Sequence, residues 1–122
     1  MDAFGAEGAR PEWTVRWPVR NEGTEAIRVL AAVHPHSQFR GPQVPLERSI
    51  RPGEQIDLAV PVRFDEKPGA IVENPFLILT IEHGGVLWRV LARVRIAAGS
   101  RGEPIADGQV IVTTNRVGAV GV

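Results

Sequence analysis

Three histidines are the residues of this chain that could bind a metal ion. His34 and His36 lie one residue apart in HPHSQF, and His83 stands before two glycines. A zinc or copper site needs three or four ligands around one point, and alternate residues of a strand share a face. Pro35, however, biases the backbone between the first two out of a strand ladder. We therefore expect three solvated histidines at strand ends, with a metal site as the alternative.

Three tryptophans could form a platform that stacks on sugar rings. They are Trp13, Trp17 and Trp88, and each falls among the apolar members of an alternating segment. Large aromatic side chains on such a face are typical of a core. The chain has no tyrosine, which antibody-like binding surfaces use heavily. Core packing is the expectation, and carbohydrate binding through an exposed tryptophan is a second alternative.

Catalytic arrangements find little support in the residues. The chain has no cysteine, which excludes thiolate nucleophiles, thiolate zinc sites and disulfides. Its serines, Ser37, Ser49 and Ser100, lie outside any G-x-S-x-G motif. The carboxylates are scattered over loops and turns, and no glycine-rich phosphate loop is present. We expect neither an enzyme nor a cofactor.

Length and charge narrow the function classes further. A chain of 122 residues fits one domain. Fourteen basic and fourteen acidic side chains give a formal net charge of zero, so the basic footprint of a nucleic-acid-binding protein is missing. No apolar run approaches the roughly 20 residues that span a bilayer, and the first residues do not form a classical signal peptide. We expect a cytoplasmic protein without membrane insertion or a nucleic-acid partner.

Apolar residues alternate with a period of two, which is the pattern of strands with one buried face. Turn signals separate the alternating segments, which are 13–20, 26–33, 55–64, 76–83, 86–97 and 109–114. The first two are expected to pair as a hairpin across an N-E-G turn, and 76–83 with 86–97 across Gly84 and Gly85. Pro18 and Pro61 indicate edge strands or bulges where they occur.

These segments predict an all-β fold, an antiparallel β-sandwich of about seven strands. A small barrel is the alternative. The sandwich is expected to span residues 11–115, with a flexible N-terminal segment at 1–10 and a flexible C-terminal tail at 116–122.

Strand and turn motifs follow one another in a distinctive order through residues 13–96. An aromatic strand precedes the N-E-G turn, a β-branched strand follows it, P-x-S-x-F stands at 35–39, and I-R-P-G-E at 50–54 leads into a long alternating strand. This order resembles bacterial immunoglobulin-like modules of the cell-adhesion-related and major-sperm-protein-like kind. The resemblance implies an immunoglobulin-like sandwich with a binding or spacer role and no catalysis. It supplies no functional residues.

The predicted hairpin at 76–96 is apolar on both of its faces. A strand of this kind is covered on both sides or lies against a partner. On the face away from Trp88, leucines alternate with arginines, which cover apolar area and bind carboxylates. The predicted interface consists of Leu77, Leu79, Leu87, Arg89, Leu91, Arg93 and Arg95.

The main hypothesis is therefore a non-enzymatic protein–protein interaction or accessory module. Its partner is another protein or a second copy of the chain, which would give a homo-oligomer. A charged outer face with incidental leucines is the alternative for this surface. A ligand-binding domain is the competing class, with metal bound through the three histidines or a carbohydrate through an exposed tryptophan.

Overall fold

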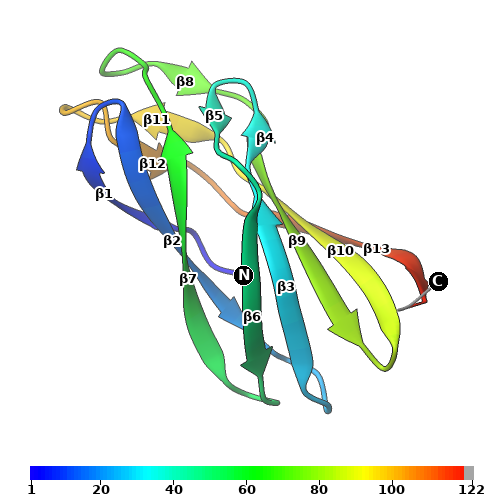
Figure 1. The fold of residues 1–122 in the computed structure, drawn as a ribbon. Helices are drawn as coiled ribbons and strands as arrows, with labels where there is room; N and C mark the ends of the chain where they lie inside the picture. Colours follow the sequence, from blue (N-terminus) through cyan, green and yellow to red (C-terminus); the bar gives the residue numbers. More distant parts are fainter. Residues whose placement is uncertain (120–122) are drawn as a thin grey trace.

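The computed structural model describes residues 1–119, and these form an all-β fold without a helix (Figure 1). Within this range no helix is therefore long or apolar enough to cross a membrane. The strands are β1 (Gly5–Ala9), β2 (Glu12–Arg20), β3 (Ile27–Val33), β4 (Pro35–His36), β5 (Phe39–Arg40), β6 (Val44–Ile50), β7 (Gln55–Arg63), β8 (Ile71–Val72), β9 (Phe76–His83), β10 (Val86–Arg93), β11 (Ile96–Ala98), β12 (Pro104–Ala106) and β13 (Ile111–Ala119). The all-β prediction is confirmed, but the strands outnumber the predicted seven because several have only two or three residues.

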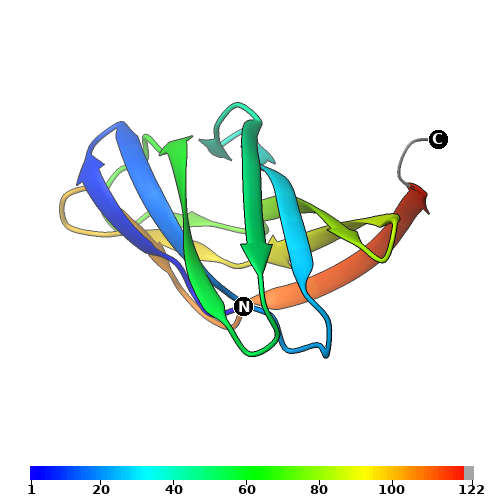
Figure 2. The same cartoon turned by 60° about the horizontal axis from the view of Figure 1, so that its bottom comes forward.

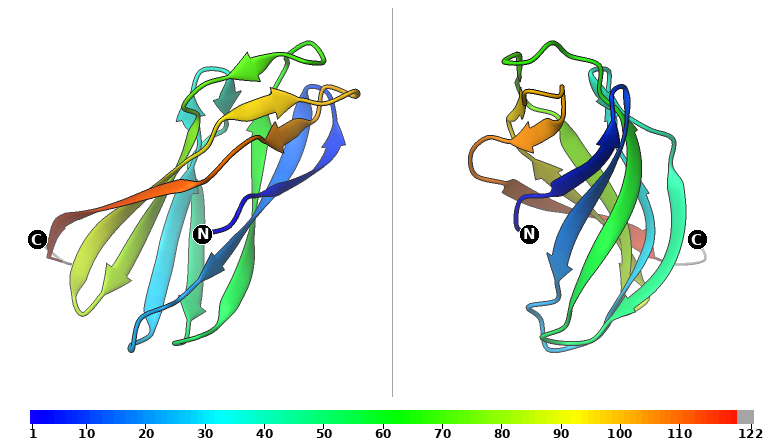
Figure 3. Two further views of the ribbon diagram at one scale, coloured as in Figure 1. Left: turned by 180° about the vertical axis from the view of Figure 1, so that it is seen from behind. Right: turned by 90° about the vertical axis from the view of Figure 1, so that its left-hand side faces the viewer.

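Two five-stranded antiparallel sheets make up most of the fold. We call them sheet A, with the order β1-β2-β7-β5-β4, and sheet B, with the order β13-β10-β9-β3-β6. A third sheet, β12-β11-β8, lies at one end of the molecule (Figure 3). β6 and β7 run next to each other at the front of the fold (Figures 1 and 2). From there, β9, β10 and β13 extend away from β1 and β2.

The core lies between the inner faces of sheets A and B. β2 alternates strictly between buried and more exposed residues, and β7 does so along most of its length, as the period-two pattern predicts. β2 and β7 pair with each other along their full length, from Glu12 opposite Arg63 to Arg20 opposite Gln55. Their buried side chains meet those of β9, and the core includes Trp13, Val15, Trp17, Val19, Leu58, Val60, Val62, Leu77, Leu79 and Ile81.

Pro18 of β2 and Pro61 of β7 lie where the strand pairs with a neighbour on one side only. β2 and β7 are central strands, so the prediction of edge strands is wrong in that form. Pairing of β1 with β2 ends at Arg16, before Pro18. Pairing of β5 with β7 involves Arg63 alone, beyond Pro61. Each proline thus lies on a locally free edge, where a missing N–H leaves no ladder bond unmade.

The N-E-G turn does not close a hairpin, which corrects the predicted pairing of 13–20 with 26–33. β2 pairs with β1 and β7, whereas β3 pairs with β6 and β9. The buried side chain of Asn21 donates its amide N–H groups to the carbonyl oxygens of Glu25 (2.8 Å) and Ile50 (2.9 Å). Its backbone also exchanges hydrogen bonds with Gly53 and Glu54 of the P-G turn. The chain is thereby tied to that turn and crosses to the other sheet.

Both ends of the described chain belong to the sandwich, which therefore extends beyond the predicted bounds 11–115. Gly5–Ala9 pair with β2, and Phe4 packs in the core with its ring 5.0 Å from that of Trp17. At the other end, residues 116–119 form the last part of β13. Glycine and alanine make up half of residues 1–10 and half of residues 116–119, so neither segment has the apolar alternation from which a strand could be predicted. Residues 120–122 of the predicted tail lie outside the described range.

Candidate interaction surface

The β9–β10 hairpin forms as predicted around two glycines with left-handed backbone. Gly84 and Gly85 have φ values of 59° and 74°, the conformation that a two-residue hairpin turn of the primed type requires. The turn sets His83 opposite Val86, and the pairing continues without a shift to Phe76 opposite Arg93. Because directly opposite residues share a face, this register decides which side chains point to the core.

Leu77 and Leu79 belong to the core face of the hairpin, so the prediction that they contact a partner is wrong. They are 0% and 1% exposed. Both faces of β9 are apolar, and the sequence of the strand alone could not show which face meets sheet A. The apolar side chains left on the outer face of this strand are Phe76 and Ile78, both half-buried.

The outer face of sheet B carries a compact apolar cluster. Val33 of β3, Ile78 of β9 and Leu91 of β10 are register partners in one row across three strands. Phe76 lies beside the row on the same face. Leu87 lies on that face too, separated from the row by Arg89 and Thr80, and all five side chains are partly exposed. We call Val33, Phe76, Ile78, Leu87 and Leu91 the outer patch.

Two arginines of β10 frame the outer patch. Arg89 and Arg93 lie on either side of Leu91 on the same face and are exposed. Among the described residues neither guanidinium takes part in an ion pair. Arg95, also predicted at the interface, lies past the end of β10 and pairs with Asp107 (3.1 Å) and Glu73 (3.8 Å). Arg95 lines a hollow together with Arg93, and its place at the interface stays a prediction.

Near the hairpin turn, β9 and β10 extend away from β1 and β2 of sheet A (Figure 1). A hollow of about 290 Å³ lies there, and Trp88 forms part of its wall. Trp88 is half-buried rather than part of the closed core, and its Nε1 is enclosed with no hydrogen-bond acceptor among residues 1–119. The other lining residues are Ile27, Ile81, His83, Val90 and Thr114.

The remaining tryptophans are core residues, as predicted. Trp13 and Trp17 are 2% and 0% exposed, and the indole N–H of Trp13 donates to the carbonyl oxygen of Phe64 at 3.1 Å. Neither can stack on a sugar, so a platform built from several exposed tryptophans is not present in residues 1–119.

The three histidines do not come together. His34 is fully buried, which corrects its prediction as a solvated loop residue, and its Nε2 accepts the indole N–H of Trp17 at 3.0 Å. His83 lies at the end of β9 and contacts Glu25. His36 is half-buried in the short hairpin of β4 and β5. Within residues 1–119 no group of three histidine, cysteine or acidic side chains is arranged to hold a metal ion.

Burial of His34 alters its chemistry. Desolvation lowers its pKa from the usual 6.5 to about 3. Phe39 meets the imidazole edge to face at 4.8 Å between ring centres, and Phe4 stacks on Phe39. An accepting Nε2 places the proton of the neutral ring on Nδ1, which has no partner. The ring is therefore a neutral acceptor for Trp17 and not a metal ligand.

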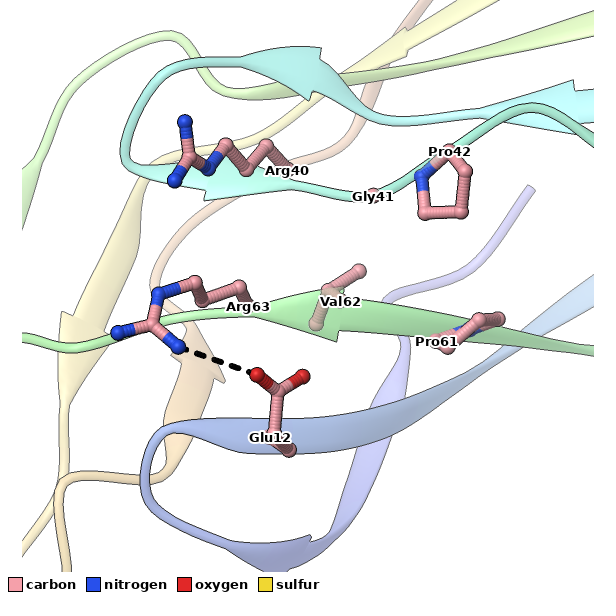
Figure 4. A pocket seen from close by; sticks show the side chains of 7 residues that line it. All are labelled: Glu12, Arg40, Gly41, Pro42, Pro61, Val62 and Arg63. Carbon is pink, nitrogen blue, oxygen red and sulfur yellow. Dashed lines mark hydrogen bonds and ion pairs between the residues drawn. The ribbon is translucent and has the colours of Figure 1, made fainter.

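A second hollow of about 290 Å³ opens between β7 and the chain that leaves β5 (Figure 4). Arg40 and Arg63 are opposite each other across the two strands, and Arg63 binds Glu12 at 3.1 Å. Arg40 has no ion pair within residues 1–119. The hollow is lined by Glu12, Arg40, Gly41, Pro42, Pro61, Val62 and Arg63. Its charged groups lie at one end of a mainly apolar surface and do not form a catalytic arrangement.

Comparison with protein-family models, curated proteins and solved structures finds no match to this chain.

Proposed function

We propose that this protein is a non-enzymatic interaction module that binds another protein through the outer patch. The observation that carries the proposal is the row Val33, Ile78 and Leu91, which places three apolar side chains in register on the face of sheet B opposite the core. Sheet faces turned to water are normally polar. A contiguous apolar cluster on such a face is typical of a contact surface.

The charges around the outer patch indicate the chemistry of the partner. Arg89 and Arg93 flank Leu91 and have no carboxylate within the described chain to bind. A complementary surface would offer apolar side chains at its centre and carboxylates at its rim. The apolar centre would supply most of the affinity, and the arginines would supply selectivity and faster association.

The accessory-module role is part of the same proposal. The sandwich supplies a rigid face on which a partner can dock. The metal-binding alternative has less support, because the histidines are separated, whereas Trp88 stays partly exposed for the carbohydrate alternative.

Comparative capture tests the proposal. The protein and its Leu91→Glu variant are immobilised, exposed to extract of the cells in which the protein occurs, and the bound proteins are identified. Ile105→Glu is the matched control, because it also replaces an aliphatic side chain by a carboxylate. Ile105 is 48% exposed and lies in the small β12-β11-β8 sheet. We expect a partner bound by the wild type and by Ile105→Glu and lost with Leu91→Glu. Equal binding by all three proteins would contradict the proposal.

A further inference from the structure

β13 is a long and weakly protected edge of sheet B. Within residues 1–119 it pairs with β10 alone, so one side of its backbone is free along nine residues. Its side chains from Ile111 to Val117 are exposed. It contains no proline and one charged residue, Arg116, and its β-bulge lies near its end, between Arg116 and Gly118. Natural sheets usually protect such edges with proline, charge or short length.

The other sheet edges show that protection. β6, at the opposite edge of sheet B, carries Pro45, Glu47 and Arg48. In sheet A, β1 has five residues and β4 has two. β13 is thus the longest edge strand of sheets A and B and has only a bulge near its end as protection, so the N–H and C=O groups of its free side can pair with another strand.

The sequence of β13 is complementary to itself about Thr114. If two copies of the strand are set antiparallel with Thr114 opposite Thr114, Thr113 lies opposite Asn115 and Val112 lies opposite Arg116. The regular part of the strand ends there, because a β-bulge lies between Arg116 and Gly118. Threonine pairs and polar pairs are favourable across antiparallel strands, and no like charges meet.

We propose that two copies of this chain associate through β13, centred on Thr114. The contact is isologous, so the same residues serve both copies. Sheet B of one copy would continue into sheet B of the other as one ten-stranded sheet. Each copy uses the one long edge of residues 1–119 that lacks proline and a charge cluster, and assembly therefore stops at two.

This inference does not depend on the proposed function. The contact uses the edge of β13, whereas the outer patch lies on β3, β9 and β10. The two-fold axis runs perpendicular to the sheet, so both outer patches would face the same way. A dimer would then offer two equivalent patches to a partner.

Sedimentation equilibrium of the full chain over a wide concentration range tests the dimer. Thr114→Glu places two carboxylates opposite each other at the axis, and we expect it to weaken association at least about tenfold. Val112→Glu is the matched control, because it adds the same charge on the same strand but places it opposite Arg116. The control should dimerise at least as well as the wild type. Equal effects of the two variants would overturn the register.

Cysteine cross-linking tests the register independently, because the chain has no cysteine of its own. Thr114→Cys would bring two thiols opposite each other, within the Cα separation that a disulfide accepts. Ile111→Cys would hold the two thiols several residues apart. Under mild oxidation with oxidised glutathione, we expect a covalent dimer for the first variant and not for the second. Circular dichroism of both reports whether they are folded.

Two results would overturn the inference. One is a wild-type chain that stays monomeric at the highest concentration reached, with Thr114→Cys folded but not cross-linked. The other is association that continues past the dimer, because a consumed edge leaves no site for a third copy. Binding of the partner to the outer patch is measured separately with Leu91→Glu, which should dimerise normally.

Discussion

Trp17 donates its indole N–H to Nε2 of His34 over 3.0 Å, and both side chains are 0% exposed. The bond joins β2 of sheet A to the residue that follows β3 of sheet B. It satisfies the one polar atom of a large core indole, as buried donors require. It also fixes the imidazole in its neutral form, because a proton on Nε2 would face the donor of Trp17.

Stability should fall as the pH drops below 6.5. The folded pKa of His34 is about 3, lower than the 6.5 of an exposed histidine. Between these values the unfolded chain binds a proton that the folded chain does not, so His34 destabilises the fold by about 1.4 kcal/mol per pH unit of acidification. Above pH 6.5 the contribution is absent. Urea unfolding at closely spaced pH values between 5 and 7.5 measures the slope.

His34→Gln is the variant that isolates this slope, because its amide oxygen can still accept from Trp17. The variant should lose the His34 contribution between pH 5 and 6.5. His36→Gln should keep it, since His34 is unchanged. A slope that persists in full in His34→Gln would assign the pH dependence to other groups.

Asn21→Asp should destabilise the protein by about 2–3 kcal/mol, because a carboxylate would replace the amide that serves two buried carbonyl oxygens. Those carbonyls belong to Glu25 and Ile50 and would lose their donor. Chemical denaturation measures the free energy of unfolding. Asn115→Asp, at an exposed position of β13, is the control and should change stability little. Similar losses of unfolding free energy in both variants would show that the Asn21 side chain does not tie the N-E-G turn to Ile50.

Substitutions on the two faces of β9 should lower the free energy of unfolding by very different amounts. Leu77→Ala removes a fully buried side chain and should cost about 2–5 kcal/mol. Ile78→Ala, one residue along on the half-buried outer face, should cost clearly less, because it leaves no closed cavity. Equal losses of unfolding free energy would mean that the outer face is covered within the chain.

Gly41→Ala should destabilise the fold, because an added Cβ would lie 2.4 Å from the carbonyl oxygen of Pro61. Either the segment that follows β5 or the backbone of β7 would have to move. Gly5→Ala is the matched control, since nothing lies within 4 Å of its added Cβ. Thermal unfolding of the two variants compares them directly, and a melting temperature for Gly41→Ala equal to that of Gly5→Ala would refute the close approach.

The strands with one buried face were predictable from sequence. β2, β7 and β9 begin and end within one or two residues of the predicted segments, because alternation reports burial directly. β6 was missed, since its sequence VPLERSI is mostly exposed and lacks alternation. The last predicted strand, 109–114, begins at Ile111 and continues to Ala119 through small and polar residues.

The candidate surface was predictable only in part. Alternation placed Leu87, Arg89, Leu91 and Arg93 together on one face, and the register agrees. It could not decide the orientation of β9, which is apolar on both sides and is set by packing against sheet A. The burial of His34 was hidden for a similar reason, since its partner Trp17 lies in another sheet. Contacts between distant strands, and not local pattern, determined both outcomes.

The most direct test of the account is the affinity of the captured partner for the outer patch, measured by isothermal titration. We predict that Leu91→Glu weakens binding about a hundredfold or more, since it places a charge at the centre of an apolar contact. Ile105→Glu should bind within about twofold of the wild type, because Ile105 lies on the small β12-β11-β8 sheet, outside the patch. Unchanged affinity in a folded Leu91→Glu variant would contradict the account.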